Sequence, residues 1–230
     1  MFKKTWVIVL FAVILLVLAG GFYAYQKGYL KQQPKSDWEK LLTFSIKDKN
    51  LSPDAAAIFQ KRFDETKEIL QKDPDTFDSW IYLGVLKKGV NDYEGARDVW
   101  VYAGRIRPKS SPPFANLADL YANFLNDPQK AKEAIETAIA NDPEDYNFYV
   151  ALAELYRYKL SGQEKLYEKT MLEAIAKFPD NANLIGPLAV YYRETGQVAK
   201  AIEYYEKLLV LSPNNAMAKQ DLAELKERIK

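Results

Sequence analysis

The sequence of 230 residues contains no cysteine and no histidine. Without cysteine the chain forms no disulfide and has no thiol nucleophile, and this absence is compatible with reducing and oxidising compartments alike. Without histidine it lacks the side chain that most often serves as a general base or transition-metal ligand near neutral pH. Glycine is scarce as well, and no glycine-rich phosphate-binding loop is present. We therefore expect a protein that is not an enzyme and that holds neither a metal nor a cofactor.

Charge is nearly balanced over the whole chain, with a net charge of +1, but it is unevenly distributed. Residues 1–50 hold 8 lysines and 3 acidic residues. The whole chain has 32 basic and 31 acidic residues, so the remaining 180 residues include 24 basic and 28 acidic ones. An acidic domain repels phosphate backbones, so we expect no nucleic-acid partner. The basic stretch at the start suits anionic lipid headgroups.

One long apolar run lies near the start of the chain, where residues 6–25 contain no charged side chain. Twenty residues of helix extend about 30 Å, which is the hydrocarbon thickness of a bilayer. Trp6 at one end and Tyr23 and Tyr25 at the other suit the aromatic belts of the two interfaces. We therefore predict that residues 1–25 form a short tail and a single transmembrane helix, over about residues 6–25.

Two questions about this segment stay open. Lys3 and Lys4 before an apolar run are also typical of a cleaved secretory signal peptide, but the apolar stretch continues past Ala19 without a polar region, which favours a retained anchor. The lysines that follow the span favour a cytoplasmic domain. A short tail with two lysines, in contrast, is similar to an uncleaved signal anchor, which keeps its N-terminus inside and translocates the rest of the chain across the membrane. We favour a single-pass protein of a bacterial plasma membrane, with an extracytoplasmic soluble domain.

Proline recurs through the rest of the chain at a nearly constant interval. By subtraction the gaps are 34, 35, 36 and 34 residues, between Pro74, Pro108, Pro143, Pro179 and Pro213. A period of about 34 is the length of one helix–turn–helix unit, which buries its apolar face only by stacking on its neighbours. The predicted segments are a juxtamembrane linker (26–50), a degenerate opening helix (51–76), four units (77–110, 111–145, 146–181 and 182–215) and a capping helix (216–230).

Each unit repeats one pattern of large and small residues. The first reads Trp80-x2-Leu83-Gly84, then Ala96-x3-Trp100, Ala103 and Pro108. The later units repeat it with Phe114, Leu117, Ala118, Tyr121, Ala131 and Ile135; Tyr149, Leu152, Ala153, Tyr156, Met171 and Ala174; and Ile185, Leu188, Ala189, Tyr192, Ala201 and Tyr205. Over residues 77 to 213 the chain resembles the tetratricopeptide repeat (TPR) family, whose signature is W-x2-L-G-x2-Y, A-x3-F and P.

The resemblance implies an all-α fold: the N-terminal transmembrane helix, then a right-handed superhelical TPR solenoid with a C-terminal capping helix. Turn signals between the two helices of each unit fall at Asn91-Asp92, Asn126-Asp127, Ser161-Gly162 and Thr195-Gly196. Three positions depart from the pattern. Lys87 replaces a tyrosine, Tyr167 replaces a small residue and is expected to splay its helices, and Pro187 kinks its helix unless that helix starts near Asn183.

The segments that flank the units have helix signals of their own. Ser52-Pro53 is a good start for a helix to about Lys72. Its apolar set is Phe59, Phe63, Ile69 and Leu70, and that of the capping helix is Met217, Leu222, Leu225 and Ile229. Within the linker, Ser36-Asp37-Trp38-Glu39 reads as a capping box before a short helix with Leu41 and Leu42, which either lies on headgroups or docks on the repeats.

The resemblance also implies a concave groove lined by the first helix of each unit, which binds a protein or peptide ligand. The predicted lining comprises Ile81, Val85, Lys88, Asp119, Asn147, Val150, Glu154, Arg157, Tyr158, Val190 and Arg193. Arg157 and Arg193 are candidates to pair with ligand carboxylates, and solvated surface arginines are the alternative. Family members that clamp the C-terminal carboxylates of chaperones use Lys and Asn where Ile81 and Val85 stand here, so that role is disfavoured.

These observations predict a membrane-tethered TPR scaffold that binds a protein or peptide partner in envelope assembly, secretion or cytochrome maturation. It resembles, in architecture only, anchored bacterial TPR proteins. The alternative is a subunit or a carboxylate-based enzyme of the cell envelope, to which Asp142, Glu144 and Asp145 would belong; their position beside a helix start favours ordinary helix capping. A third reading is a homo-oligomer formed through residues 216–230.

Overall fold

The computed structural model of this chain describes residues 36–228, and the predicted membrane span at residues 6–25 lies outside them. The chain divides into two compact units, Met1–Thr43 and Phe44–Lys230. Within residues 36–228, no helix combines the length and the apolarity needed to cross a bilayer.

The described part of the smaller unit is one short helix and a turn. The four residues of the expected capping box themselves form α2 (Ser36–Glu39). The sequence predicts a short helix after them, with Leu41 and Leu42, but the chain forms a turn there instead. The Leu41 amide donates to the Trp38 carbonyl at 2.9 Å, which tightens the chain into a turn. The Thr43 hydroxyl then donates to the Lys40 carbonyl at 3.2 Å and ends the element.

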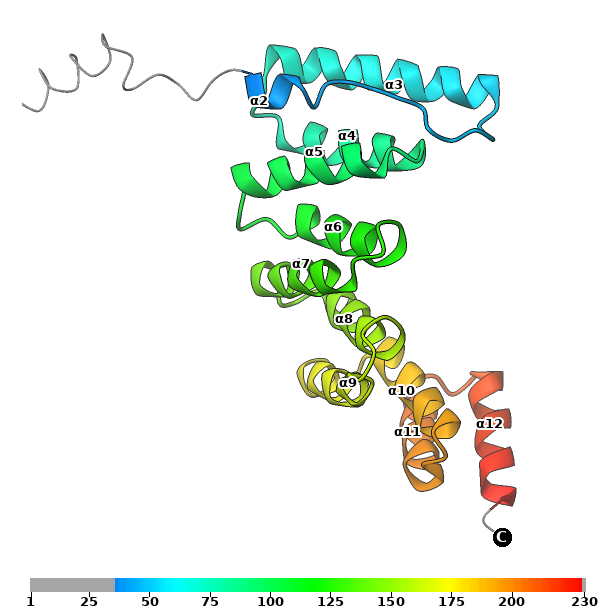
Figure 1. The fold of residues 1–230 in the computed structure, drawn as a ribbon. Coiled ribbons are helices and arrows are strands. Elements are labelled where there is room, and N and C mark those ends of the chain that lie inside the picture. Colours follow the sequence, from blue (N-terminus) through cyan, green and yellow to red (C-terminus); the bar gives the residue numbers. More distant parts are fainter. Residues whose placement is uncertain (1–35, 229–230) are drawn as a thin grey trace, which may run out of the picture. The chain divides into compact units, whose positions relative to one another are not determined.

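The larger unit is a stack of ten helices (Figure 1). They are α3 (Pro53–Lys72), α4 (Phe77–Gly89), α5 (Tyr93–Ile106), α6 (Pro112–Asn123), α7 (Pro128–Asn141), α8 (Tyr146–Tyr158), α9 (Lys165–Lys177), α10 (Ala182–Glu194), α11 (Val198–Leu211) and α12 (Ala216–Glu227). From α4 to α11 they form four helical hairpins, each packed on the next. The described residues contain no strand, and the all-helical solenoid that the sequence predicts is confirmed.

The two helices of every hairpin are joined by a turn that contains one left-handed residue. These residues are Asn91 (φ 64°), Asn126 (φ 50°), Gly162 (φ 80°) and Gly196 (φ 73°). Asparagine and glycine tolerate this conformation better than other residues, which explains why the turn signals recur. In the first two hairpins an aspartate follows at once and caps the second helix: Asp92 accepts from the Gly95 amide at 3.3 Å, and Asp127 from the Lys130 amide at 3.1 Å.

Large and small residues pack against each other inside a hairpin. The side chains of Trp80, Leu83 and Trp100 are almost fully buried between α4 and α5. A Cβ atom on Gly84 would lie only 2.2 Å from the Trp100 indole, so the glycine makes room for that ring. Both indole N–H groups are satisfied by backbone carbonyls: Trp80 donates to Pro74 at 2.8 Å and Trp100 to Ile81 at 3.1 Å.

Three residues depart from the repeat pattern: Lys87, Tyr167 and Pro187. Lys87 is only 2% exposed, with its ammonium 3.5 Å from the Asp92 carboxylate, and burial lowers the pKa of Lys87. Tyr167 is also buried, and its ring centre lies 4.6 Å from that of Tyr191 on α10. Because α10 begins at Ala182, Pro187 lies beyond the first turn, inside the helix.

The opening helix begins where the sequence predicts, since the Ser52 side chain caps α3 by accepting from the Ala55 amide at 3.2 Å. Its buried face differs from the prediction. Thr66 is buried with Phe63 and Leu70, whereas Ile69 is 47% exposed. The Thr66 hydroxyl donates to the Arg62 carbonyl at 2.7 Å, which satisfies this polar group within its own helix.

Residues 44–50, the end of the predicted linker, pack on α3 and on the first hairpin. The Lys47 and Asp48 amides both donate to the Val90 carbonyl, at 2.9 and 3.0 Å, and the Phe44 ring stacks on Phe63 at 4.6 Å. The Lys47 ammonium also lies 2.7 Å from the Asp92 carboxylate. This part of the linker is therefore fixed to the repeats.

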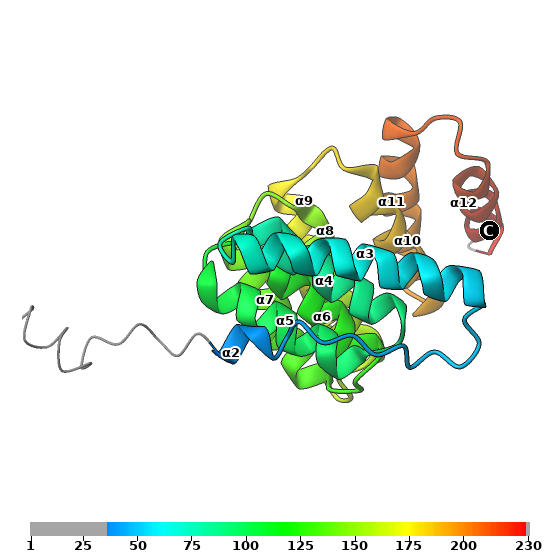
Figure 2. The same cartoon turned by 90° about the horizontal axis from the view of Figure 1, so that it is seen from above.

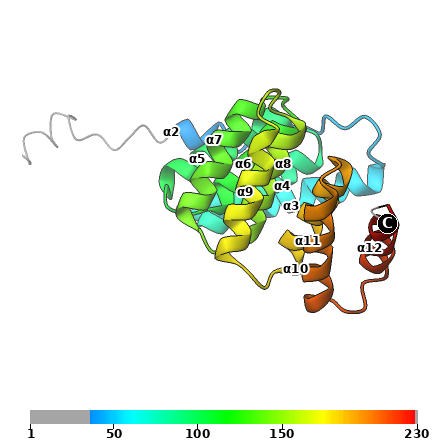
Figure 3. The same ribbon diagram turned by 90° about the horizontal axis from the view of Figure 1, so that it is seen from below.

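The stack ends at α12, which lies beside α11 (Figures 2 and 3). Its buried residues are Ala218 and Leu225, with Leu222 half-buried against the same core. The predicted apolar face placed Met217 in this contact, but Met217 is 77% exposed. Asn215 caps the helix by accepting from the Ala218 amide at 3.0 Å, and residues 218, 222 and 225 share the face that packs on the core. Ile229 lies outside the described residues.

Candidate functional site

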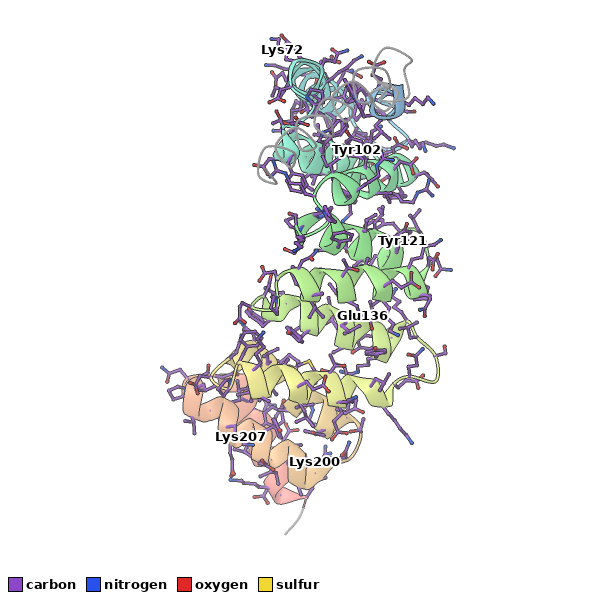
Figure 4. All side chains as sticks on the ribbon, turned by 90° about the vertical axis from the view of Figure 1, so that its left-hand side faces the viewer. Lys72, Tyr102, Tyr121, Glu136, Lys200 and Lys207 are labelled. Atoms are coloured by element: carbon purple, nitrogen blue, oxygen red, sulfur yellow. The ribbon has the colours of Figure 1, made fainter. Side chains whose placement is uncertain are left out.

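A groove with a volume of about 520 Å³ lies between α6 and α8, the first helices of the second and third hairpins. Its lining consists of Ala115, Ala118, Asp119, Ala122, Asn123, Ile135, Asn147, Phe148, Ala151, Glu154, Leu155, Tyr158 and Lys159. Figure 4 shows the side chains of these layers, with Tyr121 of α6 and Glu136 of α7 labelled.

Small side chains create the space in this groove. Ala115, Ala118 and Ala122 are three or four residues apart, so they share one face of α6. Ala151 lies on the α8 side of the groove, and Phe148 and Leu155 add a larger apolar surface there. The floor is therefore mainly apolar, and the polar groups that line the groove come from a few longer side chains.

On the α6 side, Asp119 is held in a network. Its carboxylate forms an ion pair with Lys88 of α4 and accepts from the Asn123 amide group at 2.9 Å. The Lys88 ammonium also lies 4.7 Å from the centre of the Phe124 ring. Asp119 is thus oriented by residues of two hairpins.

On the α8 side, three longer side chains that line the groove are exposed: Glu154, Tyr158 and Lys159. Tyr158 is 63% exposed, although its ring also contacts the Arg157 guanidinium at 4.9 Å. Glu154 is exposed and, among the described residues, its carboxylate has no hydrogen-bond or ion-pair partner. Asn147, at the start of the helix, donates from its side-chain amide to Asp145 at 2.8 Å.

The structure brings together four of the predicted groove residues: Asp119, Asn147, Glu154 and Tyr158 all line this groove. The others lie elsewhere. Ile81 is half-buried against one core cluster, and Val150 and Val190 are half-buried against the other. Val85 is exposed on α4, outside the groove lining.

The two arginines predicted as carboxylate ligands are engaged within the chain. The Arg157 guanidinium forms an ion pair with Glu194 of α10, and Arg193 pairs with Asp221 of α12 at 2.5 Å. Arg157 also lies over Tyr167 and Tyr191, at 4.9 and 5.1 Å from the ring centres. Both guanidiniums therefore link successive layers of the stack, and their predicted pairing with ligand carboxylates stays a prediction.

The tyrosine beside Arg157 titrates far from its usual range. Burial raises the pKa of Tyr167 to about 12, although the neighbouring Arg157 guanidinium acts in the opposite direction. Burial, followed by hydrogen bonds to Glu168 and Asp221, likewise raises the pKa values of Tyr192 and Tyr205. These phenols stay neutral in the folded chain near neutral pH.

Sequence reasoning missed Asn123, Phe148, Ala151 and Lys159 as lining residues. On α8 it predicted Asn147, Glu154 and Tyr158 correctly but added Val150 and Arg157, whereas positions 147, 151, 154 and 158 share the face on the groove. The spacing from Asn147 contained this signal, because steps of four, three and four residues follow one side of a helix.

The acidic residues near the start of α8 have structural roles. Asp145 caps this helix by accepting from the Asn147 amide at 2.9 Å, and Asp142 accepts from the Glu144 amide at 3.3 Å. The Glu144 carboxylate lies 2.9 Å from the ammonium of Lys177. The arrangement is that of a capped helix start with a surface ion pair.

Comparisons with known proteins find tetratricopeptide repeats in two parts of the chain. Models of the tetratricopeptide repeat match residues 188–215 and 119–159. The human "Interferon-induced protein with tetratricopeptide repeats 2" is 29% identical over 160 residues, which is 68% of this chain and 33% of that protein. The chain thus spans about a third of this curated relative.

Solved structures share the fold at low sequence identity. The crystal structure of MamA has a TM-score of 0.58 and is 18% identical, with coverage of 71% of this chain and 94% of that one. The structure of YrrB, described as "a TPR protein with an unusual peptide-binding site", has a TM-score of 0.53 and 15% identity, covering 71% and 82%. The larger unit of this chain therefore has the all-helical solenoid fold of these structures, and tetratricopeptide repeat models match residues 119–159 and 188–215 within it.

Proposed function

We propose that this chain is a scaffold that binds a segment of another protein in the groove between α6 and α8. The observation that carries the proposal is the groove itself: an open space of about 520 Å³ with an alanine-lined floor and exposed polar side chains. Ligand sites in proteins are typically concave and mainly apolar, with a few placed polar groups.

The chemistry of the lining suits a peptide. Side-chain amides such as those of Asn123 and Asn147 donate and accept hydrogen bonds, which matches the backbone of an extended segment. The alanine floor leaves room for the ligand's side chains, and the exposed Tyr158 supplies contact area. Binding in such a groove needs no rearrangement of the stacked hairpins.

The proposal is tested by placing a photoreactive benzoylphenylalanine at Tyr158 in the full chain, with Val210 as the matched control position on α11. Val210 is more exposed than Tyr158 but lies outside the groove lining. Crosslinking in cells should give a defined adduct from position 158 only, identified by mass spectrometry. Identical products from both positions, or no adduct from position 158, would contradict binding in the groove.

We also propose that residues 6–25 tether this scaffold to the plasma membrane, where it serves envelope assembly, secretion or cytochrome maturation. The support is the run of twenty residues without a charged side chain. Alkaline extraction of membranes should leave the chain in the pellet, and Leu15→Arg with Leu16→Arg should release it, because charges at the bilayer centre oppose insertion. Equal extraction of both proteins would contradict the tether.

The proposed extracytoplasmic side is tested by a single introduced thiol. The chain contains no cysteine, so Ser161→Cys, in the exposed α8–α9 turn, gives one labelling site. A membrane-impermeant maleimide should label it in right-side-out vesicles without detergent. Labelling only in inside-out vesicles would place the repeats in the cytoplasm.

A further inference from the structure

Ion pairs join the first helices of two pairs of successive hairpins, and a third ion pair joins the last of these helices to α12. Lys88 of α4 pairs with Asp119 of α6, Arg157 of α8 with Glu194 of α10, and Arg193 of α10 with Asp221 of α12. The three cations occupy the same place in the repeat, five residues after the leucine of the motif: Leu83, Leu152 and Leu188.

The second hairpin lacks this cation. Five residues after its motif leucine, Leu117, stands Ala122. An acid stands in the place that Asp119 takes at the preceding junction: Glu154 follows Leu152 by two residues, as Asp119 follows Leu117. The acids at the later junctions, Glu194 and Asp221, occupy other places in the repeat. Among the described residues the Glu154 carboxylate has no hydrogen-bond or ion-pair partner, and both Ala122 and Glu154 line the groove.

The groove therefore opens at the one junction among these hairpins where the cation of the motif is replaced by alanine. A lysine or arginine at Ala122 would place a long side chain in the space that the groove now occupies. The alanine thus has two consequences: it leaves Glu154 without a partner, and it leaves room for the aliphatic stem of a foreign basic side chain.

We infer that the peptide bound in this groove presents a lysine or arginine, whose charge takes the place of the missing cation beside Glu154. The inference rests on the proposed function and names the chemistry of its ligand. Asp119 adds negative charge on the other wall, although it already pairs with Lys88. Lys159, five residues after Glu154, is a cation in the lining; it disfavours a second basic residue near the C-terminal end of α8.

The test uses nine-residue peptide pools, acetylated and amidated, whose central residue is lysine, arginine, methionine or glutamate and whose other positions hold alanine, serine, leucine or tyrosine. The full chain, purified in detergent and immobilised, is incubated with each pool. We expect retention of the lysine and arginine pools to exceed that of the methionine and glutamate pools at least about tenfold.

Two substitutions test whether the preference for basic peptides depends on Glu154 and on the alanine at position 122. Glu154→Gln removes the charge and should reduce the preference to less than about threefold. Ala122→Lys supplies the missing cation from the chain itself and should have the same effect while also narrowing the groove. Glu136→Gln, the same chemical change at an exposed site on α7, is the control and should leave the preference intact.

The outcomes separate the two claims. If methionine pools are retained to the same extent as lysine pools, and Ala122→Trp abolishes retention of both, then the groove binds peptides but the inference that they present a basic residue is wrong. If no pool is retained, or if Ala122→Trp and Tyr158→Ala both leave retention unchanged, then the proposed groove is wrong as well. Circular dichroism confirms that each variant keeps its helices.

Discussion

Lys88 of α4 and Asp119 of α6 form an ion pair across the junction of the first two hairpins. At the next junction the equivalent positions hold Ala122 and Glu154, and the groove lies between them. A lysine in the first hairpin is thus replaced by an alanine in the second, at the junction where the groove lies.

The first prediction concerns the stability of that junction. Ala122→Lys is expected to form an ion pair with Glu154 and to raise the free energy of unfolding by about 0.3–1 kcal/mol, the range of exposed pairs. Urea denaturation followed by circular dichroism measures the change. In a Glu154→Gln background the gain should disappear; an equal gain in both backgrounds would show that the two side chains do not meet.

The second prediction concerns the packing of Gly84 against Trp100. Gly84→Ala places a Cβ atom 2.2 Å from the indole, and overpacking of this kind costs about 1–3 kcal/mol. That cost exceeds the gain of about 1 kcal/mol in helix propensity, so unfolding should become easier. In a Trp100→Ile background, which copies the Ala118–Ile135 pair of the second hairpin, the same substitution should be neutral or stabilising. A cost that is equal in both backgrounds would rule out this steric explanation.

The third prediction concerns Arg157, which lies over the rings of Tyr167 and Tyr191 while it pairs with Glu194. Arg157→Lys keeps the charge but loses the planar stacking, so it should destabilise the chain by about 1–2 kcal/mol. Arg97→Lys is the control. Arg97 pairs with Asp98 on the surface, at 2.8 Å, and its substitution should cost less than about 0.5 kcal/mol. Similar costs at both positions would contradict a structural role for stacking.

The fourth prediction is a loss of stability in alkali. Tyr167 has a pKa of about 12 in the folded chain, against an ordinary value of 10, because burial disfavours its charged form. The unfolded chain therefore loses this proton first, and stability should be constant below about pH 10 and fall between about pH 10 and 12. The slope from this residue is at most about 1.4 kcal/mol per pH unit. Tyr167→Phe should make the decline shallower in urea denaturation at a series of pH values; an unchanged slope would contradict burial of the neutral phenol.

The repeat architecture was predictable because its signals are local. The recurrent prolines, the turn residues such as Asn91 and Gly196, and the Ser52 cap of α3 each act within a few residues. Buried faces of the terminal helices were less predictable. The apolar residues Ile69 and Met217 are exposed, while Thr66 and Ala218 are buried, because tertiary packing rather than hydrophobicity selects the contacting face.

The candidate site was only partly predictable. Asp119, Asn147, Glu154 and Tyr158 were found from the repeat pattern, but the partners of Arg157 and Arg193 lie 37 and 28 residues further along the chain by subtraction. No local pattern shows which arginine meets which carboxylate. The alanine at position 122 can be seen when the repeats are aligned, but the ion pairs that the other three cations form can be seen only in three dimensions.

The central claim is that the groove between α6 and α8 binds a polypeptide. The most direct measurement is a methyl NMR titration of the full chain, labelled at alanine methyl groups, with the most strongly retained lysine-containing peptide. We predict that the largest shifts occur at Ala115, Ala122 and Ala151, and that Ala96 and Ala201, buried in the first and fourth hairpins, stay unchanged. Shifts that are largest outside the groove, with these three methyl groups unmoved, would contradict the claim.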